Sequence, residues 1–275
     1  MSIKKSLFKK TARILMKLRV SPLFRIRQKG FFLKFYRSSM SRVLWVDQHL
    51  SQESYTEAQR FFRRYLRPND VVVDVGANIG FFTLMYSMLV GEHGKVYAFE
   101  PHPRIYKYLQ GNLALNRVEN VYPLNLALGN RNGAVMFSDK KGDDRNSVVA
   151  DDSGITVPAK RLGEVGIENG SVSLLKIDVE GYEKFVIEGA GHLMQKVQCI
   201  YFEALDRHFL KFGYKLADLL NILINHGFQI LEVQGNKVWN ISPDCYPKTS
   251  KNLVAVREMH TFLKRTGFRF SSEIR

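Results

Sequence analysis

The sequence is poor in cysteine and has no long apolar run. Its 275 residues include two cysteines, Cys199 and Cys245. These form neither a disulfide framework nor a zinc-binding spacing, so we expect a reducing compartment. No apolar run approaches the roughly 20 residues that span a bilayer, and charges interrupt the apolar residues of the N-terminus, unlike in a secretory signal. These absences predict a cytoplasmic protein, with a peripheral position on the inner membrane face as a further expectation.

Acidic residues are absent from the first part of the chain. Residues 1–46 hold thirteen of the 41 Lys and Arg and no Asp or Glu, so the rest of the chain carries 28 basic and 26 acidic groups. We therefore expect a basic amphipathic arm over residues 1–44, interrupted at Pro22 and Gly30. Such an arm suits the surface of an anionic membrane. It also suits a nucleic acid backbone, or a helical cap packed on the domain with its charges in water.

The rest of the chain has the composition of a packed globular domain, with 45% apolar and 12% aromatic residues. A helix is expected over 45–68, with Ser51 as its N-cap. Strands and helices then alternate up to about residue 257, which predicts an α/β fold with a mostly parallel sheet covered on both faces. Residues 258–275 form a tail without a clear pattern. The expected strands are 71–75, 95–99, 120–124, 172–178, 197–203, 229–234 and 252–258, and the expected helices are 79–90, 103–115, 182–194 and 215–227.

The stretch VVVDVGANIGFFT has the pattern of a strand, a tight glycine turn and a helix. Gly76 and Gly80 permit the turn, with Asn78 between them, and Asp74 is expected to order the loop. The GxGxxG spacing that cradles a pyrophosphate is absent, which points to a nucleoside cofactor without phosphates, such as S-adenosylmethionine. Glu100 ends the next apolar run, where a carboxylate can accept hydrogen bonds from both ribose hydroxyls.

A second acidic segment, LLKIDVEGYEKFVIEGA, follows a predicted strand. Side chains alternate along a strand, so Lys176 and Asp178 share a face, and Glu180 and Glu183 follow in the turn and helix start. Crowded carboxylates raise one another's pKa, which can produce a general base near neutrality. The alternative is structural, with Lys176 paired to Glu180 or Glu183.

Four predicted strands end in acidic residues. Ligands of open parallel sheets bind beyond the carboxyl ends of the strands, so we expect these carboxylates to line one rim. A lone acid at such a place is more often a helix cap, but here the acids accompany the glycine turn. The four residues are Asp74, Glu100, Asp178 and Glu203.

Three motifs, DVGANIGFFT, AFEPHP and KIDVEGYE, together resemble the FkbM family of S-adenosylmethionine-dependent methyltransferases, over about residues 55–235. The resemblance implies a Rossmann-like fold that methylates hydroxyl groups, mainly of sugars in surface polysaccharides or glycolipids, or of secondary metabolites. It places Leu126 and Ala127 beside the adenine, and Asp178 and Glu180 near the transferred methyl group. His102 either flanks the adenine or is exposed to solvent. By the same resemblance, Asp74, Gly76, Asn78 and Gly80 match the loop that binds the cofactor, and Glu100 matches the carboxylate that binds the ribose.

Methyl transfer to oxygen needs a base for the hydroxyl proton. Asp178 is the first candidate, with Glu203 and His208 behind it, and Lys176 would orient Asp178 or stabilise an alkoxide. A divalent cation is not expected; if one were used, Asp178, Glu180 and Glu203 would hold it. Two other functions stay open: a nucleic-acid methyltransferase that uses the arm, although no Pro-Pro-aromatic motif is present, and a non-catalytic module that binds S-adenosylmethionine.

Overall fold

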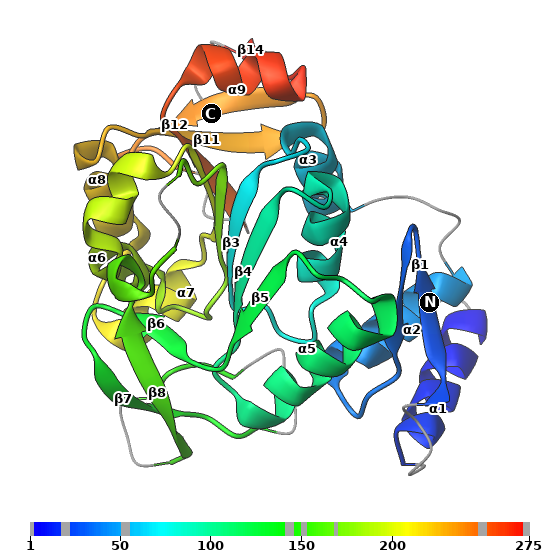
Figure 1. Cartoon of the computed structure of the whole chain (residues 1–275). Coiled ribbons are helices and arrows are strands. Elements are labelled where there is room, and N and C mark those ends of the chain that lie inside the picture. The colour runs from blue at the N-terminus through cyan, green and yellow to red at the C-terminus, as the bar shows by residue number, and fades with distance from the viewer. Residues whose placement is uncertain are drawn as a thin grey trace.

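The computed structural model of the chain describes residues 3–17, 23–50, 56–140, 146–149, 153–167, 170–246 and 252–271. A nine-stranded sheet forms its centre (Figure 1). In spatial order the strands are β14 (Arg269–Ser271), β12 (Lys237–Ile241), β11 (Gln229–Gln234), β13 (Asn252–Val256), β10 (Cys199–Glu203), β9 (Leu174–Ile177), β3 (Val71–Val75), β4 (Lys95–Phe99) and β5 (Val121–Leu124).

Strands β5, β4, β3, β9 and β10 are parallel neighbours. Strand β13 is antiparallel to both β10 and β11, so β11 points the same way as the parallel strands. The carboxyl ends of the parallel strands therefore share one edge, and the strand order reverses direction next to β3, where open sheets bind ligands. The predicted parallel α/β architecture is confirmed.

Helices cover both faces of the sheet and enclose two apolar cores, because successive strand side chains point to opposite faces. Val72 packs into one core, whereas Val73 and Val75 pack into the other. The first face carries α3 (Glu57–Tyr65), α4 (Phe81–Val90), α5 (Pro103–Asn116) and α9 (Met259–Thr266), and the second carries α6 (Glu183–Ala190), α7 (Asp206–Phe209) and α8 (Leu216–Asn225).

A separate three-stranded sheet lies between β5 and β9 in the sequence. It consists of β6 (Ala127–Gly129), β8 (Ile155–Arg161) and β7 (Gly133–Phe137) in that spatial order, around a small apolar cluster. Turn residues are abundant in this stretch of the sequence, which explains why the strand pattern did not reveal this sheet. The sheet matters for function because residues on and beside it reach the cavity described below.

The basic N-terminal part is a folded unit of α1 (Ile3–Lys17), the hairpin β1 (Arg25–Gln28) and β2 (Phe31–Lys34), and α2 (Ser39–Leu50). We call these residues the N-terminal module. The packing of α1 on α2 buries Ala12, and Ile26 and Leu33 of the hairpin are fully buried in the first core. The expected break at Gly30 is the hairpin turn, where φ is +100°; Pro22 lies outside the described residues. The arm is therefore integrated in the fold.

The single helix expected over 45–68 is wrong. Helix α2 ends at Leu50 and α3 begins at Glu57, so the boundary placed at residue 44 falls inside α2. The N-cap of α3 is Thr56, which forms a reciprocal capping box with Gln59. Ser51, the expected N-cap, lies outside the described residues.

The C-terminal segment from residue 258, expected as a tail, contributes α9 and β14. Helix α9 packs on α3, and β14 pairs with β12 at the sheet edge. Arg265 forms an ion pair with Asp70 at 2.7 Å, which ties this segment to the loop before β3. No helix of the described residues is long and apolar enough to cross a membrane.

Candidate active site

A cavity of about 280 Å³ opens at the carboxyl ends of β3, β4, β9 and β10. It is lined by the glycine loop after β3, by Glu100 and Pro101, by residues that follow β5 and β9, and by the last residue of β10. Of the predicted site residues, the lining includes Gly76, Asn78, Glu100, Leu126, Ala127, Lys176, Asp178, Glu180 and Glu203. The sheet topology therefore brings together side chains from five separate sequence segments.

Four other predicted residues do not line the cavity. Asp74 is fully buried beneath the loop, and Gly80 is the N-cap of α4. His102 is buried at the start of α5, where Nδ1 accepts a hydrogen bond from the Arg104 amide, so the expectation of an exposed histidine is wrong. Its Nε2 lies 3.0 Å from Asp139. His208 stands behind Glu180 and Glu203, as described below.

The glycine loop is held in a conformation that needs its glycines. Gly76 has φ of +79°, and a Cβ there would collide with the carbonyl oxygen of Asp178. Gly80 has φ of +87°, and a Cβ there would lie 2.6 Å from Leu109. Asn78 also adopts a left-handed conformation, which asparagine tolerates better than most residues. The loop can therefore pass close to β9, as the sequence pattern predicted.

Glu100 anchors the loop from the end of β4. Its two carboxylate oxygens accept hydrogen bonds from the backbone amides of Asn78 and His102, each at 2.9 Å. A carboxylate oxygen has a second lone pair, so Glu100 can also accept hydrogen bonds from a ligand in the cavity. It is the kind of acceptor that a ribose diol requires.

Lys176 is buried between two carboxylates. Its ammonium lies 3.4 Å from Asp74 and 3.4 Å from Asp178, and it donates to the Gly76 carbonyl at 3.0 Å. Burial acts to lower the pKa of Lys176, but the two carboxylates outweigh it and the pKa lies above its ordinary value. Thr83 donates to the other oxygen of Asp74 at 2.6 Å. Lys176 thus locks the loop to β9, and the alternative pairing with Glu180 or Glu183 does not occur.

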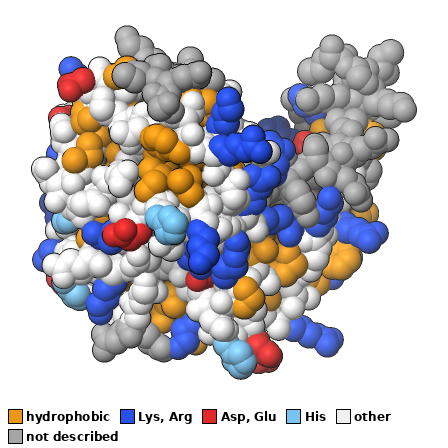
Figure 2. Space-filling view, turned by 90° about the horizontal axis from the view of Figure 1, so that it is seen from above, with side chains coloured by type: hydrophobic (Ala, Val, Ile, Leu, Met, Phe, Trp, Pro, Cys, Tyr) orange, Lys and Arg blue, Asp and Glu red, His pale blue; other side chains and the backbone are white. Residues whose placement is uncertain are grey.

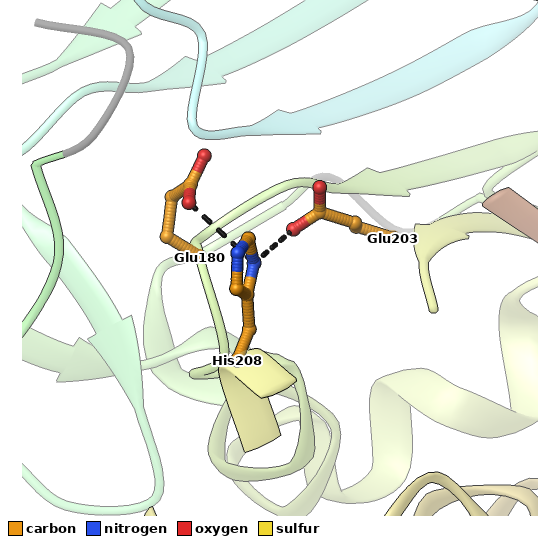
Figure 3. A group of neighbouring side chains, drawn as sticks. All are labelled: Glu180, Glu203 and His208. Atoms are coloured by element: carbon orange, nitrogen blue, oxygen red, sulfur yellow. Dashed lines mark hydrogen bonds and ion pairs between the residues drawn. The ribbon is translucent and has the colours of Figure 1, made fainter. Parts of the chain in front are cut away.

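Glu180, Glu203 and His208 form a compact cluster at the cavity (Figure 3). Glu203 ends β10, His208 belongs to α7, and Glu180 lies in the turn after β9, with both carboxylates directed at the imidazole. His208 Nδ1 lies 2.8 Å from Glu203 and 3.5 Å from Glu180. Their ligand atoms lie within 4.8 Å of one another, so this set, rather than the predicted Asp178, Glu180 and Glu203, has the geometry to hold a cation.

The carboxylates of this cluster are poised to bind protons near neutrality. Burial, together with the charges of Glu203 and Asp178, raises the pKa of Glu180 to about 7. Burial, together with the charge of Asp178, raises the pKa of Glu203 to about 7. Burial lowers the pKa of His208, against the attraction of Glu180. Asp178 is nearly half-exposed and paired with Lys176, whereas Glu180 and Glu203 are less exposed and contact His208.

The turn that presents Glu180 is firmly fixed. Glu180 has φ of +58° and Gly181 has φ of +110°, and a Cβ at Gly181 would collide with the His208 backbone. Tyr214 donates to the Gly181 carbonyl at 2.7 Å, and Glu183 accepts from the Val179 amide at 3.1 Å. A non-glycine residue in this conformation stores strain, a feature that clusters at functional sites.

Several cavity residues carried no signal that sequence reasoning could use. Met40 comes from α2, Phe81 and Phe82 from the start of α4, and Asn146 and Val148 from the segment between β7 and β8. Each is an ordinary apolar or polar residue in an element whose position depends on tertiary contacts. Phe81 and Phe82 stand directly after the glycine loop, the one sequence feature that could have suggested them.

The residues of the cavity fit a nucleoside cofactor without phosphates. Within the part of the chain that the structure describes, its lining includes one basic side chain, Lys176, and that ammonium is engaged by Asp74 and Asp178. The fold, with its inserted antiparallel strand β13, and the loop anchored by Glu100 define a class I methyltransferase, an enzyme that uses S-adenosylmethionine. The chain belongs to the FkbM methyltransferase family, because the methyltransferase FkbM domain matches residues 74–270. The predicted resemblance is confirmed.

Three relatives illustrate this membership. The chain is 26% identical to 2-O-methyltransferase NoeI of Sinorhizobium fredii, over 57% of this chain and 72% of the relative. It is 26% identical to hexuronic acid methyltransferase AglP of Haloferax volcanii, over 63% and 71% of the two chains. It is 28% identical to 31-O-demethyl-FK506 methyltransferase FkbM of Streptomyces tacrolimicus, over 68% and 84%.

Proposed function

We propose that this enzyme methylates a hydroxyl group of a sugar, in a polysaccharide or a glycolipid. The observation that carries the proposal is the pair of carboxylates, Glu180 and Glu203, that face the cavity with pKa values of about 7. A hydroxyl group must lose its proton during methylation, and a base with a pKa near the working pH serves this best. The relatives named for 2-O-methylation and for a hexuronic acid support a sugar acceptor.

We assign the cofactor to the loop side of the cavity. Glu100 would accept the ribose hydroxyls, Leu126 and Ala127 would border the adenine, and Gly76 and Asn78 would follow the methionine part. S-adenosylmethionine supplies a methyl carbon activated by a positively charged sulfur. Asp74 would not contact the cofactor. It would hold the loop in place through its contacts with Lys176 and Thr83.

Proton removal falls to the acidic cluster. Glu203 or Glu180 would accept the hydroxyl proton as the new oxygen–carbon bond forms, and His208 would orient Glu203 through their 2.8 Å contact. This route requires no divalent cation, so we expect turnover to survive dialysis against EDTA. Lost turnover that Mg²⁺ or Mn²⁺ restores would assign the cluster to a metal instead.

Calorimetry tests the cofactor assignment. We expect S-adenosylmethionine and S-adenosylhomocysteine to bind the full chain, and NAD not to bind. Glu100→Ala should weaken binding of both sulfur compounds at least about tenfold, because a buried acceptor of charge-assisted hydrogen bonds is worth about 1.5–3 kcal/mol. Binding of NAD alone, or of none of the three, would refute the proposed function.

We further propose that residues 1–44 make peripheral contact with an anionic membrane. Figure 2 shows a band of Lys and Arg side chains on the face of the body seen from above, and residues 1–46 add thirteen Lys and Arg with no Asp or Glu. In the hairpin, Arg25 and Arg27 are exposed together with Phe32, and Leu23 just before it is 74% exposed. Cations beside exposed apolar groups suit a lipid surface, at about 1 kcal/mol per cation.

Vesicle sedimentation tests this contact. The double variant Arg25→Glu with Arg27→Glu should bind vesicles of phosphatidylglycerol and phosphatidylcholine at least about tenfold more weakly than the unaltered chain. Vesicles of phosphatidylcholine alone are the control. Equal binding by the variant would exclude a membrane role for the hairpin, and preferential binding of a DNA duplex would favour the nucleic-acid alternative.

A further inference from the structure

The N-terminal module reaches the active-site cavity through Met40. This residue stands in the first turn of α2 and lines the cavity beside Phe81 and Phe82. The turn is fixed from within: the Ser41 amide donates to the buried Ser38 hydroxyl at 2.9 Å, and the Tyr36 amide donates to the Ser41 hydroxyl at 3.1 Å. Met40 is therefore held at a definite place on the cavity wall.

The module is also docked rigidly on the methyltransferase body. Asn112 of α5 accepts from the Lys34 amide at 2.8 Å and donates to the Ile79 carbonyl at 2.7 Å. Asn116 accepts from the Phe32 amide and donates to the Phe32 carbonyl. Two asparagine side chains thus take the place of a neighbouring strand along β2, and one of them bonds directly to the cofactor loop.

Ring contacts extend this docking toward the cavity. Phe31 of β2 packs edge-to-face on Phe81, with ring centroids 5.9 Å apart, and Phe81 packs on Phe82 at 5.0 Å. Tyr36, which follows β2, stacks on Tyr108 of α5 at 4.1 Å. A sub-ångström displacement of the module would shift the Phe81 ring, because packed interiors transmit displacement.

We propose that Met40, Phe81 and Phe82 form an apolar wall of the acceptor subsite, and that this wall takes the C–H face of an uncharged sugar ring. The proposal rests on the methyltransferase function proposed above. Aromatic faces carry partial negative charge and attract polarised C–H groups, while the hydroxyl groups of the ring would face Glu180 and Glu203. Binding sites of small molecules commonly combine apolar walls with a few polar groups in this way.

The charges of the cavity argue against an anionic acceptor. Among the described residues, the lining includes Glu100, Asp178, Glu180 and Glu203 and one ammonium, that of Lys176, which two carboxylates already engage. A sugar carboxylate placed beside Glu180 and Glu203 would be repelled, because like charges close together in a desolvated site are strongly unfavourable. A neutral hexose or 6-deoxyhexose meets no such penalty.

Saturation-transfer NMR on the full chain, with saturating S-adenosylhomocysteine, tests this subsite. The probes are the methyl glycosides of glucose, galactose, mannose and rhamnose, together with methyl glucuronoside. The variants are Met40→Ala and the nearly isosteric Met40→Gln, which keeps the packing volume. Met40→Leu is the conservative rescue, and Val43→Ala, on the exposed side of the same helix, is the matched control.

We expect at least one neutral glycoside to bind, and methyl glucuronoside to bind at least about tenfold more weakly. Met40→Ala and Met40→Gln should weaken binding of the neutral glycoside about fivefold or more. The affinities of Met40→Leu and Val43→Ala for this glycoside should stay within about twofold of that of the unaltered chain. Unchanged glycoside binding by both Met40→Ala and Met40→Gln overturns the proposal, as does binding of no neutral glycoside or equal binding of the glucuronoside. S-adenosylhomocysteine binding is measured first on each variant, and its absence in the unaltered chain would instead refute the proposed function.

Discussion

Single residues set the protonation chemistry of this site. Glu180 and Glu203 share a partly buried volume with His208, and Asp178, Arg207 and Lys211 add charge around them. Because the groups interact strongly, the protons leave in steps that belong to the cluster and not to one residue. The cluster should be largely deprotonated, and so active as a base, above a pH of about 7.

Glu203→Gln tests the role of this residue as the base. We expect kcat to fall about 10²–10⁴-fold, the range of general-base catalysis, with little change in S-adenosylhomocysteine affinity. In the unaltered enzyme kcat/KM should rise with pH up to about 7, and in the variant this rise should flatten. Glu92→Gln, at a surface position, is the control. A variant that retains full rate and the same pH profile would shift the role to Glu180 or Asp178.

Glu183 gives the protein a stability that depends on pH. It is fully buried at the start of α6, and burial raises its pKa to about 8. Because the pKa of Glu183 in the folded state lies above the ordinary value of a glutamate, its contribution to the free energy of unfolding is fully present below about pH 4.5. That contribution is lost as the pH rises to about 8. We expect Glu183→Gln to become more stable, relative to the unaltered chain, across that interval. Thermal unfolding of both proteins at pH 5, 6.5 and 8 measures this, and a difference in Tm independent of pH would contradict it.

At the scale of elements, the contact between β2 and α5 joins the N-terminal module to the cofactor loop. Asn112 is fully buried and satisfies backbone groups of Lys34 and Ile79. The sequence predicted α5 and the loop and left open a helical cap packed on the domain, but it did not predict the hairpin or its contacts with α5. Side-chain hydrogen bonds between distant segments leave no periodic pattern, which explains why the module was expected as an arm.

Asn112→Ala would remove the side-chain partner of the buried Ile79 carbonyl and of the partly buried Lys34 amide. Each such group costs about 1–3 kcal/mol, so we expect a stability loss of about 2–6 kcal/mol in urea unfolding. We also expect weaker S-adenosylhomocysteine binding, because Ile79 belongs to the cofactor loop. Gln110→Ala, at an exposed position on the same helix, is the control. A loss of stability without any change in cofactor affinity would show that the module does not support the loop.

At the scale of the whole molecule, the C-terminal segment closes the first core. Phe262 of α9 is buried against Phe61, Tyr65 and Phe268. We expect Phe262→Ala to reduce the free energy of unfolding by about 3–5 kcal/mol, the usual cost of such a cavity, with lower Tm and unchanged cofactor binding in the folded protein. Phe270→Ala, at a half-exposed position on β14, should change stability by less than about 1 kcal/mol. Equal effects of the two changes would show that α9 is not part of the core.

The sequence by itself determined the parallel sheet, the glycine loop and the acids at the strand ends. These features are local: strand runs, positive-φ glycines and the residues that end strands depend on neighbours in the sequence. Lys176 and Asp178 share a face because strand side chains alternate, and the structure places their charged groups 3.4 Å apart. The family resemblance rested on the same local motifs.

Only the tertiary structure decided which acids lie together, what stands behind them and what completes the cavity. In the folded protein His208 contacts Glu203, and Asp74 lies beneath the loop, where it pairs with Lys176. Met40 lines the cavity. It also incorporated the basic N-terminal part and the C-terminal segment into one core. The physical reason is that burial, desolvation and contacts between segments far apart in sequence arise from packing, which no local pattern encodes.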